Sequence, residues 1–379
     1  MVAAATPGVT APIGYAPASS VVTDQERPGL LRSPTRERST AYDDRGVVFE
    51  VCAINEIDGA EEAPRFLEAG FEAVRLPRQP GLIALLGEIR EAGEAGDEQV
   101  TRLRSLLTGA AIELADGSRL RVDHVADEGV IVRHAGPGGI EVDGAEHHGA
   151  VNVHIDQDVL GTPLRQLFDG GAAEVFGHDS PDSQNHTSAQ YLVNLWLPLR
   201  QVTRPLTLMD GRSLDRQRHQ LRYQLPVDGF LDRQEDQSVN DIWVCLHDPA
   251  QAWWFRAEAG LGDAYVFNTL STPHASFVLP GEDVAADRYR RLGMVIEAVR
   301  AGDPGRAGES ASVPPPDLDR TAGRSLRAAV AAMDDLLAEA RAVPATELDA
   351  AWCARAEAAR DGVVRCSLEL RAVVTRLHP

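Results

Sequence analysis

VNVHIDQD, residues 151–158, is the stretch on which the rest of this chain is organised. It is a β-branched run that carries a histidine, His154, and an aspartate, Asp156, two residues apart. Successive side chains of a strand point to opposite faces, so residues two apart share a face. The pattern therefore predicts a strand that presents an imidazole and a carboxylate side by side.

A second histidine far along the chain would complete a metal site. Two imidazoles and one carboxylate form the facial triad of non-haem iron(II) enzymes, which leaves coordination positions open. In TPHASF, residues 272–277, a histidine follows Thr-Pro and opens a strand-like run. We therefore predict that His154, Asp156 and His274 hold an iron(II) ion. The ordinary alternative is that His154 packs as a core histidine and Asp156 serves as a turn or cap residue.

Composition limits the class of protein. The chain has 379 residues, of which 44% are hydrophobic, as in ordinary soluble globular proteins. The formal net charge of −20 disfavours nucleic acid as a partner, because phosphates need basic side chains. The sequence contains no lysine, which excludes Schiff-base catalysis and a P-loop. We find neither an apolar run long enough for a membrane span nor the pattern of a signal peptide, so we expect a cytoplasmic protein.

Patterning divides the chain into four segments. Residues 1–44 are rich in Pro, Ser, Thr and Arg without periodicity, which predicts a disordered or loosely attached arm. Residues 45–300 contain many short strands with turn signals, which predict a mainly β (α+β) domain with flanking helices, built as an antiparallel sandwich or jelly roll. Residues 301–317 form a Gly/Pro linker, and 318–379 have the apolar stripes of a C-terminal α-hairpin. This hairpin is expected to serve as a packing clasp or as a homodimer surface.

Three local predictions bear on the site. LGMVIEA, residues 292–298, is predicted to be the last strand of the β domain. The apolar stripe from Leu348 to Val373 is predicted to be the second helix of the hairpin, and residues 214–223 a polar helical insert.

An iron(II) triad usually serves 2-oxoglutarate, whose distal carboxylate favours an arginine fork. We expect this arginine on the strand that follows His274. Arg291 is the first choice, with Arg290 and Arg288 behind it. The alternative for each of them is a solvated basic turn.

Four further residues are candidates for the pocket. Tyr191 is predicted to hydrogen-bond the carboxylate of the cosubstrate. Asn194 and Trp196 share one face of their strand, where both line the cavity or both pack in the core. Arg212 clamps an anionic substrate or forms a structural ion pair with Asp210.

Six sequence blocks occur in an order that resembles one family. They are GF (70–71), HIDQ (154–157), NLWLPL (194–199), PLTLMDGRS (205–213), QAWWFR (251–256) and TPHASF (272–277). With them, residues from about 46 to 298 resemble the AsaB/CmcJ family of Fe(II)- and 2-oxoglutarate-dependent oxygenases, which includes cephalosporin 7α-hydroxylase-like enzymes.

The resemblance implies a double-stranded β-helix, an iron held by His154, Asp156 and His274, and decarboxylation of 2-oxoglutarate to succinate and CO2 with O2. It implies natural-product metabolism, in which an unactivated C–H of a small polar or amino-acid-like substrate is oxidised. Hydroxylation is the default outcome, with desaturation or cyclisation as variants. Leu197 and Met209 depart from the family's Arg and Cys, which leaves the substrate open. A cupin-like metal enzyme without 2-oxoglutarate and a non-catalytic β-sandwich binding module stay open as alternatives.

Overall fold

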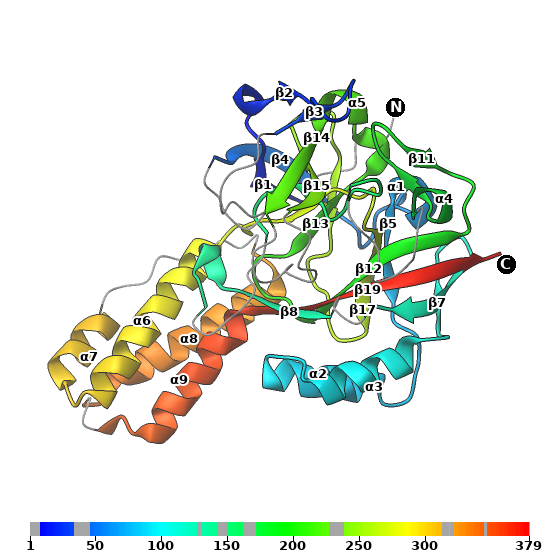
Figure 1. Cartoon of the computed structure of the whole chain (residues 1–379). Helices are drawn as coiled ribbons and strands as arrows, with labels where there is room; N and C mark the ends of the chain where they lie inside the picture. The colour runs from blue at the N-terminus through cyan, green and yellow to red at the C-terminus, as the bar shows by residue number, and fades with distance from the viewer. Residues whose placement is uncertain are drawn as a thin grey trace.

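A β-rich body and a cluster of helices beside it make up the molecule (Figure 1). The structure is a computed structural model. It describes residues 8–33, 46–126, 130–142, 150–161, 172–226, 239–312, 318, 322–344 and 347–378. None of the helices in these ranges is long and apolar enough to cross a membrane.

Eight strands in two sheets form the core of the β-rich body. One sheet has the order β8 (Ile131–Ala135), β19 (Arg365–Leu377), β12 (Gln190–Arg200) and β17 (Asp263–Asn268), and the other the order β9 (His154–Ile155), β18 (His274–Ser276), β13 (Leu206–Met209) and β16 (Trp253–Phe255). All neighbours within each four are antiparallel. Along the chain these strands alternate between the sheets except from β13 to β16. This is the strand order of a double-stranded β-helix, or jelly roll, so the predicted fold is confirmed.

Further strands widen both sheets. The sheet with β9 continues through β15 (Val239–Cys245), β14 (Gln220–Pro226), β3 (Leu31–Arg32) and β2 (Val22–Thr23), and at its other edge through β4 (Val48–Glu56) and β1 (Val9–Tyr15). The sheet with β19 continues through β7 (Arg119–Val125) and β6 (Ala111–Glu113), and beyond β17 through β5 (Phe71–Arg75). The prediction of a loosely attached N-terminal arm is wrong for β1, β2 and β3, because these strands hydrogen-bond to the sheet.

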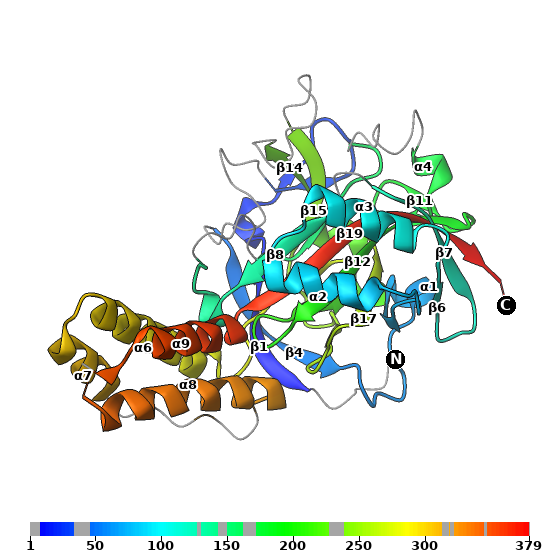
Figure 2. The same ribbon diagram turned by 90° about the horizontal axis from the view of Figure 1, so that it is seen from below.

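The alternation of side chains along β12 separates two apolar layers. Val193 and Leu195 face the helices α2 (Leu82–Ala92) and α3 (Asp97–Leu107). These helices lie across β19 and β12 when the molecule is seen from below (Figure 2). Trp196 faces the other way, into a cluster with residues of the second sheet such as Leu208 and Trp254. The space between the two sheets is therefore where the inward residues of β12 and β19 meet those of β9 and β18.

Four helices lie between β18 and β19 in the sequence. They are α6 (Glu282–Arg300), α7 (Pro304–Ser312), α8 (Arg324–Ala342) and α9 (Ala350–Val363), and they share an apolar core of their own. Figure 1 shows this cluster to one side of the sheets, with the chain returning to the body as β19. The apolar stripe of α8, from Leu326 to Leu337, is buried in this core.

The strand predicted at residues 292–298 is wrong, because these residues belong to α6. Leu292, Val295 and Ile296 are buried at positions that follow the helical repeat rather than alternation. The helix predicted from Leu348 to Val373 is wrong in its second half, since α9 ends at Val363 and β19 follows. The helical insert predicted at 214–223 is only a single turn, α5 (Arg216–His219), before β14.

Candidate metal centre

Two neighbouring strands bring the predicted histidines together. His154 opens β9 and His274 opens β18, and the two residues are direct partners across the antiparallel ladder. Asp156 follows one residue after the end of β9. Backbone pairing between the strands thus places two imidazoles side by side, with the carboxylate next to them.

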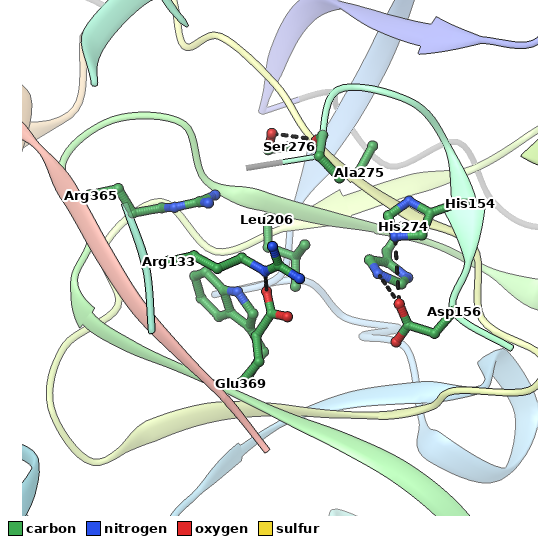
Figure 3. Close-up of a pocket in the computed structure, with 11 residues that line it drawn as sticks. Arg133, His154, Asp156, Leu206, His274, Ala275, Ser276, Arg365 and Glu369 are labelled. Atoms are coloured by element: carbon green, nitrogen blue, oxygen red, sulfur yellow. Dashed lines mark hydrogen bonds and ion pairs between the residues drawn. The ribbon is translucent and has the colours of Figure 1, made fainter. Parts of the chain in front are cut away.

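The ligand atoms of these three residues converge on one point (Figure 3). Oδ1 of Asp156 lies 3.5 Å from Nε2 of His154 and 3.5 Å from Nε2 of His274. All three ligand atoms lie within 4.8 Å of one another, and no second group of this kind occurs in the part of the chain that the structure describes. Two ligand atoms bound at right angles to one ion are about 3 Å apart. A small contraction therefore suffices for these residues to bind a metal as a facial set.

The protonation of the histidines suits a metal ligand. Nδ1 of His154 lies 2.9 Å from the Asn152 carbonyl oxygen, and Nδ1 of His274 lies 3.1 Å from that of Thr272. Each Nδ1–H can donate to its carbonyl, which leaves the Nε2 lone pair for the ion. Burial, helped by the neighbouring His154, lowers the pKa of His274 to about 4, so this imidazole is neutral near pH 7.

The aspartate is held as a carboxylate. Burial by itself raises the pKa of Asp156, but the neighbouring imidazoles and the Arg371 guanidinium outweigh burial and hold this pKa well below its usual range. Nδ2 of Asn194 lies 3.5 Å from Oδ2 of Asp156. Oδ2 is thereby turned to the amide while Oδ1 faces the histidines, an orientation that favours ligation through one oxygen.

A cavity adjoins the three ligands. Besides the triad, its walls are formed by Arg133, Ala150, Trp196, Leu206, Ala275, Ser276, Arg365 and Glu369. Figure 3 shows the triad on one side of this cavity and Arg365 with Arg133 on the opposite side. Of the residues predicted for the pocket, Trp196 lines this cavity and Asn194 contacts the triad.

Arg365 is a buried cation on the wall of this cavity. Its side chain is 2% exposed, and no carboxylate of the described residues lies within ion-pair distance. One Nη donates to the Arg204 carbonyl oxygen, whereas Nε is buried without a partner. Burial and the nearby Arg204 lower the pKa of Arg365 to about 10. An uncompensated buried charge is costly, so this wall of the cavity is suited to bind an anion.

Three further polar residues follow Arg365 on β19 at intervals of two residues. Side chains two apart on β19 share a face, so Ser367, Glu369 and Arg371 point inward with Arg365. The hydroxyl oxygen of Ser367 is buried without a hydrogen-bond partner. Glu369 is already engaged, because its carboxylate lies 2.7 Å from Nε of Arg133.

Sequence reasoning missed these residues although their pattern is regular. Inward polar residues at 365, 367, 369 and 371 alternate with the outward apolar residues Cys366, Leu368, Leu370 and Ala372. Such alternation is the signature of a half-buried strand. The nearby apolar residues at 366, 370 and 373 also fit a helix, which is the structure that we predicted for this segment.

The arginines predicted to bind 2-oxoglutarate lie elsewhere. Arg288 is buried among the helices, where its Nε lies 2.8 Å from Asp334, and Arg291 pairs with Asp287 at 2.7 Å. Arg290 is exposed on the same helix, α6. None of the three lines the cavity at the triad. The predicted strand after His274 is therefore corrected. The element that follows β18 in the sequence is the helix α6, and the strand that pairs with β12 is β19, which comes after four helices.

Tyr191 and Arg212 line a second, separate cavity. This cavity includes none of the triad residues in its walls. Tyr191 packs on the outer face of β12, opposite to Asn194 and Trp196, so it does not point to the metal centre. Arg212 forms the structural ion pair that was its alternative, with a distance of 2.7 Å to Asp210.

The convergence of the three ligands excludes one alternative, the non-catalytic β-sandwich binding module. The binding module without a metal centre required that the two histidines and the aspartate stay apart, and in the structure they do not.

Comparison with known proteins gives limited information. No family model matches the chain, so its resemblance to the AsaB/CmcJ family is not confirmed, and no curated protein matches it. Among solved structures it is similar to the iron and α-ketoglutarate-dependent endoperoxidase NvfI, with 12% identity, 97% of each chain covered and a TM-score of 0.46. The same enzyme in a different conformation gives 11% identity over 98% of this chain and 99% of that one, with a TM-score of 0.49. A likeness of this strength supports no further conclusion about this chain.

Proposed function

We propose that this protein is a non-haem Fe(II)- and 2-oxoglutarate-dependent oxygenase. The observation that carries the proposal is the convergence of His154 Nε2, His274 Nε2 and Asp156 Oδ1 inside a double-stranded β-helix. Three protein ligands on one side of an iron leave positions for a cosubstrate and for O2. When bound, the iron couples decarboxylation of 2-oxoglutarate to oxidation of a substrate C–H bond.

Arg365 and Ser367 are the residues that we assign to the distal carboxylate of 2-oxoglutarate. The cation is buried and lacks an acidic partner among the described residues, and the hydroxyl lacks a hydrogen bond. A carboxylate accepts charge-assisted hydrogen bonds from an arginine fork and from a hydroxyl. The keto acid end of the same molecule would then lie toward the triad, across the cavity from Arg365.

The substrate is proposed to be a small polar or amino-acid-like molecule of natural-product metabolism. Support comes from the polar wall of the cavity, in which Arg133 and Glu369 form an ion pair beside Trp196. Hydroxylation is the default outcome, and desaturation or cyclisation would use the same ligands. Trp196 closes the cavity toward the core and excludes water from that side.

The test is anaerobic titration of the Fe(II)-loaded protein with 2-oxoglutarate. Chelation of the iron by the keto acid gives a weak visible charge-transfer band, which we expect for the wild type. His154→Ala and Asp156→Ala are each expected to lose iron, whereas Arg365→Gln keeps iron and loses affinity for 2-oxoglutarate. Stoichiometric iron retained by both triad variants would contradict the proposed centre.

A metal enzyme that does not use 2-oxoglutarate is the second candidate. Glu369 favours it, because this carboxylate faces the cavity and would repel an anion bound there. An iron-loaded wild type that shows no band at saturating 2-oxoglutarate would select this candidate over the first.

A further inference from the structure

Asp156 lies beyond the hydrogen-bonded part of its strand. β9 contains only His154 and Ile155, so the ladder that fixes His154 does not extend to the aspartate. The backbone that follows is tied down in another way. The N–H of Gln157 donates to the Thr269 carbonyl at 3.3 Å, and that of Asp158 donates to the Asp241 carbonyl at 3.0 Å. The position of the carboxylate ligand therefore depends on what holds residues 157 and 158.

The side chain of Asp158 is fully buried and anchors this turn. Its Oδ2 accepts a hydrogen bond from the Gly161 N–H at 2.8 Å and forms an ion pair with Arg27. The same guanidinium lies 3.1 Å from Asp182 and 3.3 Å from Asp241. One arginine thus joins the turn after the metal ligand to the neighbouring strand β15 and to the loop between β10 (His178–Asp179) and β11 (Gln184–Asn185).

Arg27 comes from the N-terminal hairpin and is itself held in place. Oδ1 of Asp24 accepts hydrogen bonds from the backbone N–H of Glu26 at 2.8 Å and of Arg27 at 3.1 Å. Oδ2 of Asp24 lies 2.9 Å from Arg222 on β14. Since β3 also pairs with β14, the turn that carries Arg27 is fixed to the sheet before the guanidinium reaches Asp158.

The turn after the aspartate packs closely against these ion pairs. A Cβ at Gly161 would overlap the Asp241 carboxylate and the Arg27 guanidinium. The backbone at this point approaches the ion pairs as closely as only glycine permits. Movement of Arg27 or Asp158 is therefore transmitted to the chain between Asp156 and Gly161.

We propose that Arg27 is a positioning residue of the metal centre. Through Asp158 it fixes the turn that carries Asp156, so that Oδ1 of Asp156 meets the two imidazoles. The N-terminal hairpin of residues 22–32 thus belongs to the metal centre although none of its side chains binds the ion. The inference rests on the proposed function only in that the triad binds a divalent metal.

Co(II) is the probe for this role, because its visible absorption reports both affinity and coordination geometry. We expect Arg27→Gln to raise the dissociation constant for Co(II) by about tenfold or more, as substitutions behind metal ligands do. The Co(II) bands should change in shape as well, and Arg27→Lys, which keeps the charge, should recover part of the affinity. A purely structural loss would lower the melting temperature of the metal-free protein and leave the bands unchanged.

Arg288→Gln is the matched control. It removes another buried arginine with an acidic partner, but one in the helical cluster. This variant is expected to lose thermal stability and to bind Co(II) as the wild type does. Equal dissociation constants for Arg27→Gln and the wild type, or an equal loss in Arg288→Gln, would overturn the inference.

A double variant tests the same inference if Arg27→Gln alone does not fold. In Arg27→Gln the buried Asp158 carboxylate loses its arginine, and the fold itself is at risk. Arg27→Gln combined with Asp158→Asn removes this charge. The folded double variant should still bind Co(II) more weakly than the wild type. Wild-type affinity in the double variant would refute the role of Arg27. His154→Ala identifies binding at the triad. A wild type that binds no Co(II) at this site contradicts the proposed function, whereas unchanged affinity in the arginine variants contradicts this inference alone.

Discussion

Replacement of Arg365 by Gln separates ligand binding from stability. In most buried ion pairs, removal of the cation leaves a carboxylate unpaired and destabilises the protein. Arg365 has no such partner among the described residues, so Arg365→Gln strands no carboxylate of the described chain. The variant does lose the hydrogen bond to the Arg204 carbonyl and the contact with the Trp196 ring, 5.9 Å from the guanidinium.

The two effects on the folded protein oppose each other. The lost hydrogen bond and ring contact are worth about 1 kcal/mol each. Relief of a buried charge that forms no ion pair with a described carboxylate is of similar size, and the lowered pKa of Arg365 agrees in direction. We therefore expect the free energy of unfolding of the ligand-free protein to change by no more than about 1 kcal/mol.

Binding of 2-oxoglutarate should respond far more strongly. Truncation of one partner in a desolvated, hydrogen-bonded charge pair costs about 3 kcal/mol, which is roughly 100-fold in the dissociation constant. The assay is anaerobic titration of the Fe(II)-loaded variant, with urea unfolding of the ligand-free protein alongside. A dissociation constant within threefold of the wild type would refute the assignment of Arg365.

Arg133→Gln is the matched comparison for this prediction. Arg133 faces the same cavity but pairs with Glu369 at 2.7 Å, and both side chains are mostly buried. Its loss leaves a carboxylate in the cavity, so this variant should be less stable than Arg365→Gln by about 1 to 3 kcal/mol. Equal stability of the two variants would contradict the distinction between a paired and an unpaired arginine.

Three further outcomes follow from the same contacts. Asn194→Ala removes the amide that turns Oδ2 of Asp156, and it should weaken Co(II) binding about tenfold in a spectroscopic titration; unchanged affinity would mean that the amide does not orient the ligand. Leu370→Ala opens a cavity between β19 and the helices α2 and α3, with an expected loss of about 2 to 5 kcal/mol in urea unfolding. The apolar stripe of α8 is buried within the chain rather than left for a partner, so size-exclusion chromatography should give the mass of a monomer, and a dimer would argue for a second surface.

The three candidate metal ligands were predictable because their signals are local or chemically specific. The alternation of side chains along a strand predicts that His154 and Asp156 share a face. The Thr-Pro-His sequence marks the start of β18. The short strands with turn signals in residues 45–300 also predicted the β-helix fold. What the sequence did not show was that residues 8–33 add strands and the arginine that reaches Asp158.

The arginine that we propose for the cosubstrate site, Arg365, lies away from the predicted position for a reason that lies in the topology. Position along the chain suggests that the strand after His274 completes the sheet, and Arg288 to Arg291 stand near the expected place. In a β-helix, however, the strand beside β12 is defined by its hydrogen bonds, and β19 makes ten residue pairs with β12 after a detour through four helices. Such pairing depends on contacts between residues far apart in sequence, and local periodicity carries no information about these contacts. The alternation from Arg365 to Arg371 could have shown a strand, but only its ladder with β12 and β8 turns that strand's polar face toward the triad.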